Sequence, residues 1–477
     1  MAAARLKAFD NREEELVHKH SLRCLDEIGV MIKSESVRAD LERAGAKVDH
    51  KTGVTRIPGS MVKEALGNAP KSFILCAREP KHDKPVPVKS HPWMATTGLA
   101  VYTLDLETGA RRSTTSKDLA NFSRMADAMN GVDICWTTVT AHDVVQKALA
   151  PHSLWTALQN NTKHIQVVPP TNGAEDARKQ VELASLVAGG KEQLKKRPLF
   201  SVIMCPVAPL SFEKHSVEAQ AEFARAGIPI VCMSMSLSGG SAPVTVAGTI
   251  VNINSENLAS LVISQVSSKG APFIYSSESA PIDMTTGVMD YIGYEIPLIN
   301  AGASQMAHRY GLPCMVSSWG TETKEPGIQC SFSELSVTLV GNMVGSDLCS
   351  GAGSIDSAKG ASLEQVVIDS YLWENCIPMM RGFEVSEDSI ALDVTKAVGH
   401  GNTYLKHVHT ARNFRKHIAF RDQTKKLWEA TLSTKMAPEA REVARKVLKE
   451  HKVPPLAPDV LMEGDKLLEE YDKRLSG

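Results

Sequence analysis

A single loop of this sequence brings together an aromatic ring, two carboxylates, a lysine and a glutamine. It follows an apolar run of strand type at Pro313–Ser318, and a helical pattern comes after it. In a βα barrel, loops in this position line the active site. The loop is suited to holding a small, charged, partly methylated molecule. The side chains that could contact such a molecule are Trp319, Glu322, Lys324, Glu325 and Gln329.

Two residues of this loop are the predicted catalytic residues. Glu325 can face a cation, and Gln329 can orient a substrate. Each also has a simpler interpretation, because Glu325 can be a solvated loop carboxylate and Gln329 can begin a helix. Glu278 and Asp283, which follow another strand-like run, are open to the same two interpretations.

Aromatic side chains near strand ends are the second chemical signal. Aromatic residues form only 5% of the chain, and the face of an aromatic ring attracts a cation by about 0.5–2 kcal/mol. We therefore predict that Tyr102, Trp136, Tyr275 and Trp319 bind the substrate. Trp136 and Tyr275 can also be packing residues.

Strand-like and helix-like segments alternate through the middle of the chain. This alternation indicates an α/β fold with a parallel sheet, and eight strands indicate a closed (β/α)8 barrel, or TIM barrel. The runs are short and apolar, as expected for strands buried on both faces. The expected strands are Trp93–Thr97, Asp133–Val139, His164–Val168, Leu199–Met204, Pro229–Met235, Pro272–Ser276, Pro313–Ser318 and Asp347–Ser350.

We expect three parts of the chain. Residues 1–92 form an N-terminal α+β prefix, which opens with a helix from Asp10 to about Ile32. Residues 93–383 form the catalytic barrel, and residues 384–477 form a charged helical extension over or beside it.

The totals exclude several classes of protein. The chain has 477 residues and a formal net charge of −1, with 53 basic and 54 acidic residues, so bulk charge favours neither nucleic acid nor a membrane surface as a partner. No window approaches the roughly 20 apolar residues of a membrane span, and the first residues lack the apolar core of a secretory signal. We expect a cytoplasmic protein, with self-association as a general prior.

The nine cysteines include no Cys-x-x-Cys pair. We interpret them as small buried hydrophobic residues in a reducing compartment and predict no bound metal. The alternative is a zinc thiolate site that uses Cys205 and Cys349, because both lie near strand ends.

Five blocks of sequence, taken in order, resemble the trimethylamine methyltransferase family of corrinoid-dependent enzymes. The resemblance covers most of the chain, and it is the order of the blocks that makes it specific. The blocks are residues 238–245 (Ser-Gly-Gly-Ser-Ala-Pro-Val-Thr), 283–287 with Glu295, 311–329, 350–354 with 362–369, and 399–401 with 404–415.

The resemblance implies a barrel that moves a methyl group from a methylated amine to Co(I) of a separate corrinoid protein. The founding members of the family carry pyrrolysine at or next to the position of Glu325, whereas this chain has only standard residues there. It is therefore similar to the non-pyrrolysine branch, whose substrates are quaternary amines such as glycine betaine.

The chemistry of the leaving group favours the same donor. A neutral tertiary amine would have to leave as an amide ion, which requires activation. A quaternary ammonium leaves as a neutral amine. The enzyme therefore only has to bind and orient the methyl donor and the Co(I) acceptor and to exclude water from between them. We therefore expect glycine betaine as the methyl donor and dimethylglycine as the product, with proline betaine, carnitine or γ-butyrobetaine as alternatives.

A betaine also carries a carboxylate that needs hydrogen-bond donors. The candidates are His142, His407, His409 and Arg412, the last three because the C-terminal extension can fold over the mouth of the barrel. The two histidines of the extension can instead tie it to the barrel. Arg415 and Lys416 can dock the corrinoid protein.

Two other functions stay open. One is a zinc-dependent methyltransferase, which needs three protein ligands at strand ends and which metal analysis would reveal. The other is a non-catalytic barrel that binds betaine or a corrinoid protein, and such a barrel would bind its ligand without turnover.

Overall fold

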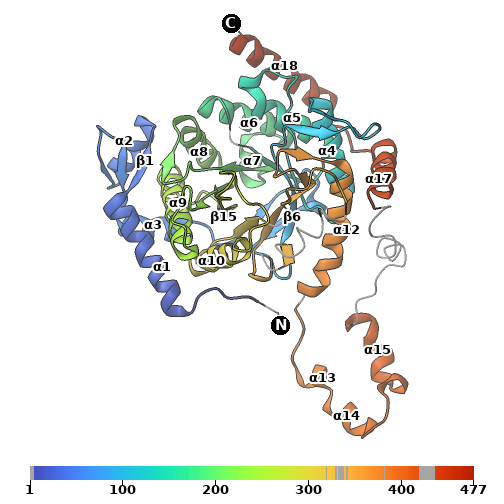
Figure 1. The fold of residues 1–477 in the computed structure, drawn as a ribbon. Helices are drawn as coiled ribbons and strands as arrows, with labels where there is room; N and C mark the ends of the chain where they lie inside the picture. The colour runs from blue at the N-terminus through green and yellow to red at the C-terminus, as the bar shows by residue number, and fades with distance from the viewer. Residues whose placement is uncertain are drawn as a thin grey trace.

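Eight parallel strands form a closed barrel at the centre of the computed structural model (Figure 1). The structure describes residues 5–168, 170–317, 320–327, 330, 338–339, 342–380, 382–417 and 436–476. The barrel strands, in chain order, are β6 (Trp93–Thr96), β9 (Ile134–Trp136), β10 (His164–Val167), β11 (Phe200–Met204), β13 (Ile230–Ser234), β15 (Phe273–Ser277), β17 (Cys314–Ser317) and β18 (Leu348–Ala352). Each expected strand is present, and the predicted (β/α)8 barrel is confirmed.

The order of the strands decides which side chains face each other across the barrel. The circuit runs β10, β11, β13, β15, β17, β18, β6 and β9, so β15 lies opposite β9, and β17 lies opposite β10. Every residue of β11, β13 and β15 is buried, which explains why these strands have apolar runs without alternation. Because all neighbours are parallel, the carboxyl ends of the strands meet at one mouth.

Helices surround the barrel and fix the direction of the strands. They are α4 (Ser116–Ala128), α5 (Leu149–Asn160), α6 (Gly173–Ala188), α7 (Lys191–Lys196), α8 (Lys214–Ala226), α9 (Val246–Ser267), α10 (Ile296–Arg309) and α12 (Leu363–Met380). Helix α9 is buried on nearly all sides because it lies between the barrel and the prefix helices. None of the helices within the described residues is both long enough and apolar enough to cross a bilayer.

The N-terminal prefix packs on the outside of the barrel, where its helices contact α9 and α10. Its first helix begins as predicted, with a capping box between Asp10 and Glu13, but it does not reach Ile32. The chain turns at Gly29, whose φ of +81° favours glycine, and then forms a strand. The elements are α1 (Asn11–Arg23), η1 (Cys24–Ile28), β1 (Val30–Ile32), α2 (Glu35–Arg43), β2 (Lys47–Val48), β3 (Val54–Arg56), α3 (Gly59–Asn68), β4 (Phe73–Leu75), η2 (Pro80–His82) and β5 (Lys84–Val86).

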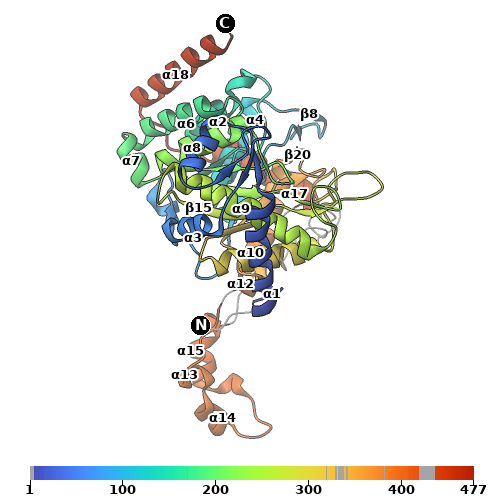
Figure 2. The same cartoon turned by 90° about the vertical axis from the view of Figure 1, so that its left-hand side faces the viewer.

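Short strands in the loops that follow the barrel strands build walls around the mouth. One four-stranded sheet has the order β19-β20-β7-β8, and β14 pairs with β16. Figure 2 shows β8 and β20 on one side of the barrel. The loop elements are β7 (Tyr102–Leu104), β8 (Arg111–Ser113), η3 (Gln146–Ala148), β12 (Ser211–Phe212), β14 (Leu237–Ser238), β16 (Ala280–Pro281), β19 (Ser354–Ile355) and β20 (Gly360–Ala361).

The C-terminal extension has two parts that behave differently. Helices α17 (Met436–Glu450) and α18 (Pro458–Ser476) return to the barrel, where α17 packs on α12 and α4, and α18 packs on α6. Residues 384–417, which we call the arm, project away from the barrel in both views (Figures 1 and 2). The arm contains α13 (Glu387–Ile390), α14 (Leu392–Val398), η4 (Tyr404–Lys406) and α15 (Val408–His417).

Candidate functional site

A carboxylate stands at the mouth of the barrel, directly after β15. The amide of Glu278 donates to the carbonyl of Ser234 (2.9 Å), and the hydroxyl of Ser317 points to its Oε1 at 3.5 Å. Burial raises the pKa of Glu278 to about 7, and the Ser317 hydroxyl opposes this only in part. A carboxyl group that is half ionised near neutral pH is a strong acceptor for a cation that enters the mouth.

An amide crosses the barrel just below this carboxylate. Gln166 of β10 is fully buried, and its Nε2 lies 3.8 Å from the sulfur of Met315 on the opposite strand β17. Met315 pairs in register with Ser276, which is two residues before Glu278. The Gln166–Met315 contact therefore closes the mouth of the barrel from below. We call this contact the floor of the site, and Glu278 lies above it.

Trp136, the last residue of β9, lies across the barrel from Glu278. Its indole belongs to the apolar cluster of the barrel interior, and it is 6% exposed. A Cβ on Gly98 would lie 2.2 Å from the indole ring, so only glycine lets the ring lie so close to the backbone of the loop after β6. Trp136 pairs with Gln166 in register, which places it at the level of the floor.

Several polar atoms of this inner wall have no hydrogen-bond partner among the described residues. They are Trp136 Nε1, Gln166 Oε1, Ser276 Oγ and Ser350 Oγ. Buried polar groups are normally paired, because an unpaired one costs about 1–3 kcal/mol. Their concentration on neighbouring levels of one barrel indicates a site that receives a polar molecule.

Tyr291, in the loop before α10, is an aromatic neighbour of the carboxylate that the sequence analysis missed. Burial raises its pKa, and the negative charge of Glu278 raises it further. A Cβ on Gly320 would lie 2.9 Å from the tyrosine ring, so the ring lies against the backbone just after position 319. This contact joins two separate loops, so no pattern in the sequence indicated that Tyr291 belongs to the site.

Tyr275 lies on the other side of the barrel wall from the site. It is 1% exposed and faces α9, where its hydroxyl donates to Asn254 Oδ1 at 3.2 Å. The neighbouring residues Ile274 and Ser276 take the inward positions of β15, because successive side chains of a strand point to opposite faces. Tyr275 therefore does not reach the mouth, and we leave it out of the candidate site.

Tyr102 and Glu325 meet at the rim, in a cleft of about 470 Å³ that also contains Arg111 and Arg441. The Tyr102 hydroxyl donates to Asp356 Oδ2 (2.9 Å), and burial raises the pKa of Tyr102 to about 12. The guanidinium of Arg111 already covers the ring face, with Cζ 3.8 Å from the ring centroid. Tyr102 is thus a structural residue of the rim, whereas Glu325 is exposed.

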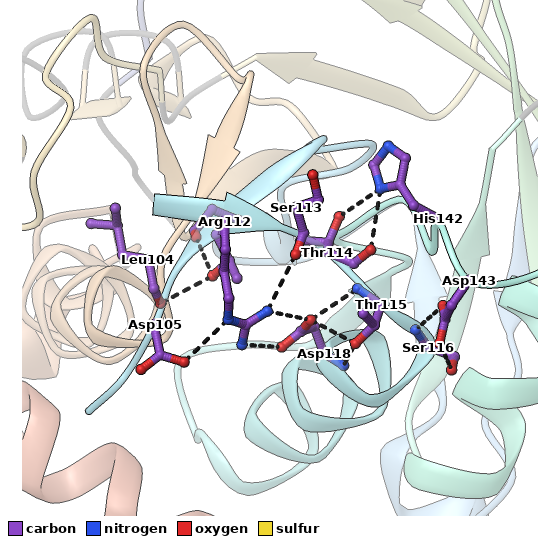
Figure 3. Close-up of polar contacts among 12 residues, drawn as sticks. Leu104, Asp105, Arg112, Ser113, Thr114, Thr115, Ser116, Asp118, His142 and Asp143 are labelled. Atoms are coloured by element: carbon purple, nitrogen blue, oxygen red, sulfur yellow. Dashed lines mark hydrogen bonds and ion pairs between the residues drawn. The ribbon is translucent and has the colours of Figure 1, made fainter. Parts of the chain in front are cut away.

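His142 lies at the edge of the mouth, beside the polar network that holds the β7–β8 hairpin (Figure 3). Its Nδ1 lies 3.1 Å from the carbonyl oxygen of Thr114, and the ring is exposed. Arg112 joins the hairpin to the start of α4 through two 2.8 Å bonds to Asp118. Burial alone would raise the pKa of Asp118, but Arg112 and Thr115 outweigh it and hold the pKa below its usual value.

The other predicted residues do not come together at the mouth in the described structure. His407, His409 and Arg412 lie on the arm, which does not cover the barrel (Figure 1). Trp319 and Gln329 lie outside the described residues, so their places in the site remain predictions.

Comparison with known proteins identifies the family. The sequence matches the trimethylamine methyltransferase (MTTB) family over residues 2–475. This chain belongs to that family. It is 32% identical to trimethylamine methyltransferase MttB of Desulfitobacterium hafniense strain DCB-2, over 86% of the chain and 82% of the relative. It is also 27% identical to a glycine betaine methyltransferase of D. hafniense strain Y51, over 84% and 83%.

Solved structures confirm the fold of this methyltransferase. The monomethylamine methyltransferase MtmB of Methanosarcina barkeri superposes with a TM-score of 0.51 over 94% of both chains, at 12% identity. A hydroxylamine complex of MtmB gives a TM-score of 0.52 over 93% of both chains, also at 12% identity. At this identity the comparison establishes the shared barrel alone.

The two cysteines of the alternative zinc site do not converge in this methyltransferase. Cys205 faces the barrel interior, and burial raises the pKa of its thiol to about 12. Cys349 belongs to a separate cluster against α12, with Sγ 3.7 Å from Met94 Sδ. Among the described residues, the group with metal-ligand spacing is His308, Cys314 and Asp347. It lies at the opposite end of the barrel, where Asp347 accepts the amide hydrogens of Val88 and Cys314.

Proposed function

We propose that this methyltransferase transfers a methyl group from glycine betaine to Co(I) of a partner corrinoid protein and releases dimethylglycine. The observation that carries the proposal is Glu278, a carboxylate inside the mouth with a pKa of about 7. It is flanked by Tyr291 and lies across the barrel from Trp136. A carboxylate beside aromatic rings is the usual protein environment for a quaternary ammonium.

The trimethylammonium end of the substrate lies against Glu278 and Tyr291. This end must face the open mouth, because the methyl acceptor approaches from outside. Trp319, which follows β17 by two residues, is the predicted third aromatic contact. A quaternary nitrogen has no N–H to donate. It is therefore recognised by the faces of aromatic rings and by the charge of a carboxylate, and not by directional hydrogen bonds.

The carboxylate end of the substrate points toward the floor. The unpaired donors there are the Nε1–H of Trp136 and the hydroxyls of Ser276 and Ser350. A charged acceptor would satisfy these donors at once, which supports a dipolar betaine over a simple amine. The 27% identity to a glycine betaine methyltransferase gives independent support.

The reaction needs no acid from this chain. Co(I) of the corrinoid protein supplies the nucleophile that accepts the methyl group. The electron pair of the N–CH3 bond stays on nitrogen, so the product leaves as a neutral amine without a proton. Glu278 and Tyr291 hold the nitrogen, the floor holds the carboxylate, and the apolar wall excludes water. A low-dielectric site favours a step in which opposite charges are neutralised.

The rim of the mouth supports a protein partner. Large apolar side chains are exposed in the loops after β6, β11, β13 and β15, on the face from which the acceptor must arrive. Exposed apolar groups gathered on one face indicate an interaction surface. They are Val101, Val207, Val244, Met284, Val288 and Tyr294.

A substrate panel tests the proposal. We expect purified enzyme with free Co(I) cobalamin to methylate the corrinoid from glycine betaine and not from trimethylamine, as followed by the visible spectrum. Methylation from trimethylamine alone would refute the donor. Tight binding of glycine betaine with no methylation from any amine would instead favour the non-catalytic barrel, and stoichiometric zinc in the purified protein would favour the metal-dependent alternative.

Substituting Trp136 tests the orientation of the substrate. We expect Trp136→Phe, which keeps a ring but removes the N–H donor, to raise the KM for glycine betaine by roughly tenfold or more, the usual effect of losing a hydrogen bond to a charged group. The KM for tetramethylammonium, which has no carboxylate, should stay within about threefold. Trp373→Phe, on α12 outside the barrel, is the matched control. An equal increase in KM for both methyl donors would show that the indole does not bind the substrate carboxylate.

A further inference from the structure

The arm, residues 384–417, is a long segment that makes few contacts with its own barrel. It leaves the end of α12 and returns as α15 without lying on the barrel helices (Figures 1 and 2). The hydrogen bonds between described residues that involve the arm, such as Thr410 Oγ1 to the carbonyl of Tyr404 (2.8 Å), all join two arm residues. Ordering a segment of this length requires surface to be buried somewhere.

The arm exposes large apolar side chains instead of burying them. Leu405 is 82% exposed and Leu392 is 71% exposed. Other apolar side chains that are more than half exposed are Val385, Ile390 and Val408. A short segment that displays this much apolar surface is typical of an interface.

The charges of the arm fall into two blocks. Residues 384–393 contain Glu384, Glu387, Asp388 and Asp393 and no basic residue. Residues 396–416 contain Lys396, Lys406, Arg412, Arg415 and Lys416 and no acidic residue. Within the described part of the chain, none of these charges forms an ion pair. Each block therefore lacks an oppositely charged partner within the described part of the chain, and the two blocks are complementary to each other in charge.

We propose that the arm pairs with the arm of a second copy of this chain around a two-fold axis. In a two-fold interface the same surface is used by both partners, so the acidic block of one copy faces the basic block of the other. Both sets of charges are then paired, and the exposed leucines are covered between them. A standard interface uses roughly 20–30 residues on each side, which the arm can supply.

Charge reversal tests this pairing on the full-length enzyme. The basic-arm variant carries Glu384→Lys, Glu387→Lys and Asp388→Lys, and the acidic-arm variant carries Lys406→Glu, Arg415→Glu and Lys416→Glu. We expect light scattering after size exclusion to give a dimer, or a multiple of one, for the parent enzyme and half that mass for each variant alone. Each variant should dissociate about 100-fold more readily, because like charges then face each other.

An equimolar mixture of the two variants is the decisive sample. Both contacts between blocks are attractive in the mixed dimer, because each joins a positive block of one variant to a negative block of the other, so the parent mass should return. Thermal unfolding of the barrel, followed by circular dichroism, should be the same in all samples. A monomeric parent, or variants that keep the parent mass, would overturn the proposal. A monomeric parent whose variants lose turnover with the corrinoid protein but not with free cobalamin would assign the arm to that partner instead.

Discussion

Glu278→Gln is expected to raise the KM for glycine betaine by about 10- to 100-fold while kcat stays the same or rises slightly. The glutamine keeps the size of the side chain and removes the charge that faces the ammonium group. Two opposite unit charges about 4 Å apart attract each other by about 1 kcal/mol in water and about 4 kcal/mol at a protein-like dielectric constant of about 20, which brackets this range. The nitrogen loses its positive charge during methyl transfer, so the carboxylate holds the ground state at least as strongly as the transition state. Its contribution therefore appears in KM.

The control for this variant is Glu192→Gln on the exposed helix α7. Initial rates should be measured at pH 8, where Glu278 is ionised. An unchanged KM would remove Glu278 from the binding site. A large fall in kcat at unchanged KM would give the residue a role in the chemical step, which our account does not contain.

The sequence predicted the barrel because its strands are buried on both faces and its helices are amphipathic. Residues 230–233 and 273–275 are apolar without the alternation of a surface strand, and the helical segments between such runs favour a parallel arrangement. The same property hides the direction of the side chains. Tyr275 and Ser276 are equally buried, so the sequence offers no polarity that tells which of them faces the interior.

The candidate site was only partly visible for a related reason. Trp136 was chosen as an aromatic residue at a strand end, and the structure places it on the inner wall. Glu278 was weighed and not chosen, because a carboxylate in a loop looks the same in sequence whether it is solvated or buried. Its partner Tyr291 comes from the loop before α10, and its position depends on Gly320. Contacts between separate loops produce no characteristic spacing of residues in the sequence.

The arm shows a third limit of sequence analysis. The segment around His407 was expected to fold over the mouth as part of the C-terminal extension, and the structure directs that segment away (Figure 2). Amphipathic helices bury their apolar face against some surface, but the sequence does not say whether that surface belongs to the same chain. The separation of charges between residues 384–393 and 396–416 was the available signal, and it gains meaning only when the arm is seen apart from the barrel.

The ionisation of Glu278 should control the pH dependence of kcat/KM. Its pKa of about 7 means that the free enzyme holds a neutral carboxyl below that pH and a carboxylate above it. We expect kcat/KM for glycine betaine to reach a plateau near pH 8, to fall as the pH drops below 7, and to level off about 10- to 100-fold lower, near the value of Glu278→Gln. Because the charge of Glu278 contributes to KM and not to the chemical step, kcat should stay nearly constant through the same pH range. Glu278→Gln should give a flat profile through the same range.

Stability should change with pH in the opposite direction. A carboxyl whose pKa is raised on folding stabilises the folded state below its unfolded pKa, and this stabilisation is lost as the pH rises through the folded value. Without substrate, the midpoint of thermal unfolding should therefore drop between pH 5 and pH 8 more in the parent than in Glu278→Gln. Saturating glycine betaine should reverse most of that drop in the parent alone. A quaternary nitrogen has no proton to lose, so a change in rate or stability near pH 7 must come from a group of the enzyme. If Glu278→Gln still shows that change, the group is not Glu278.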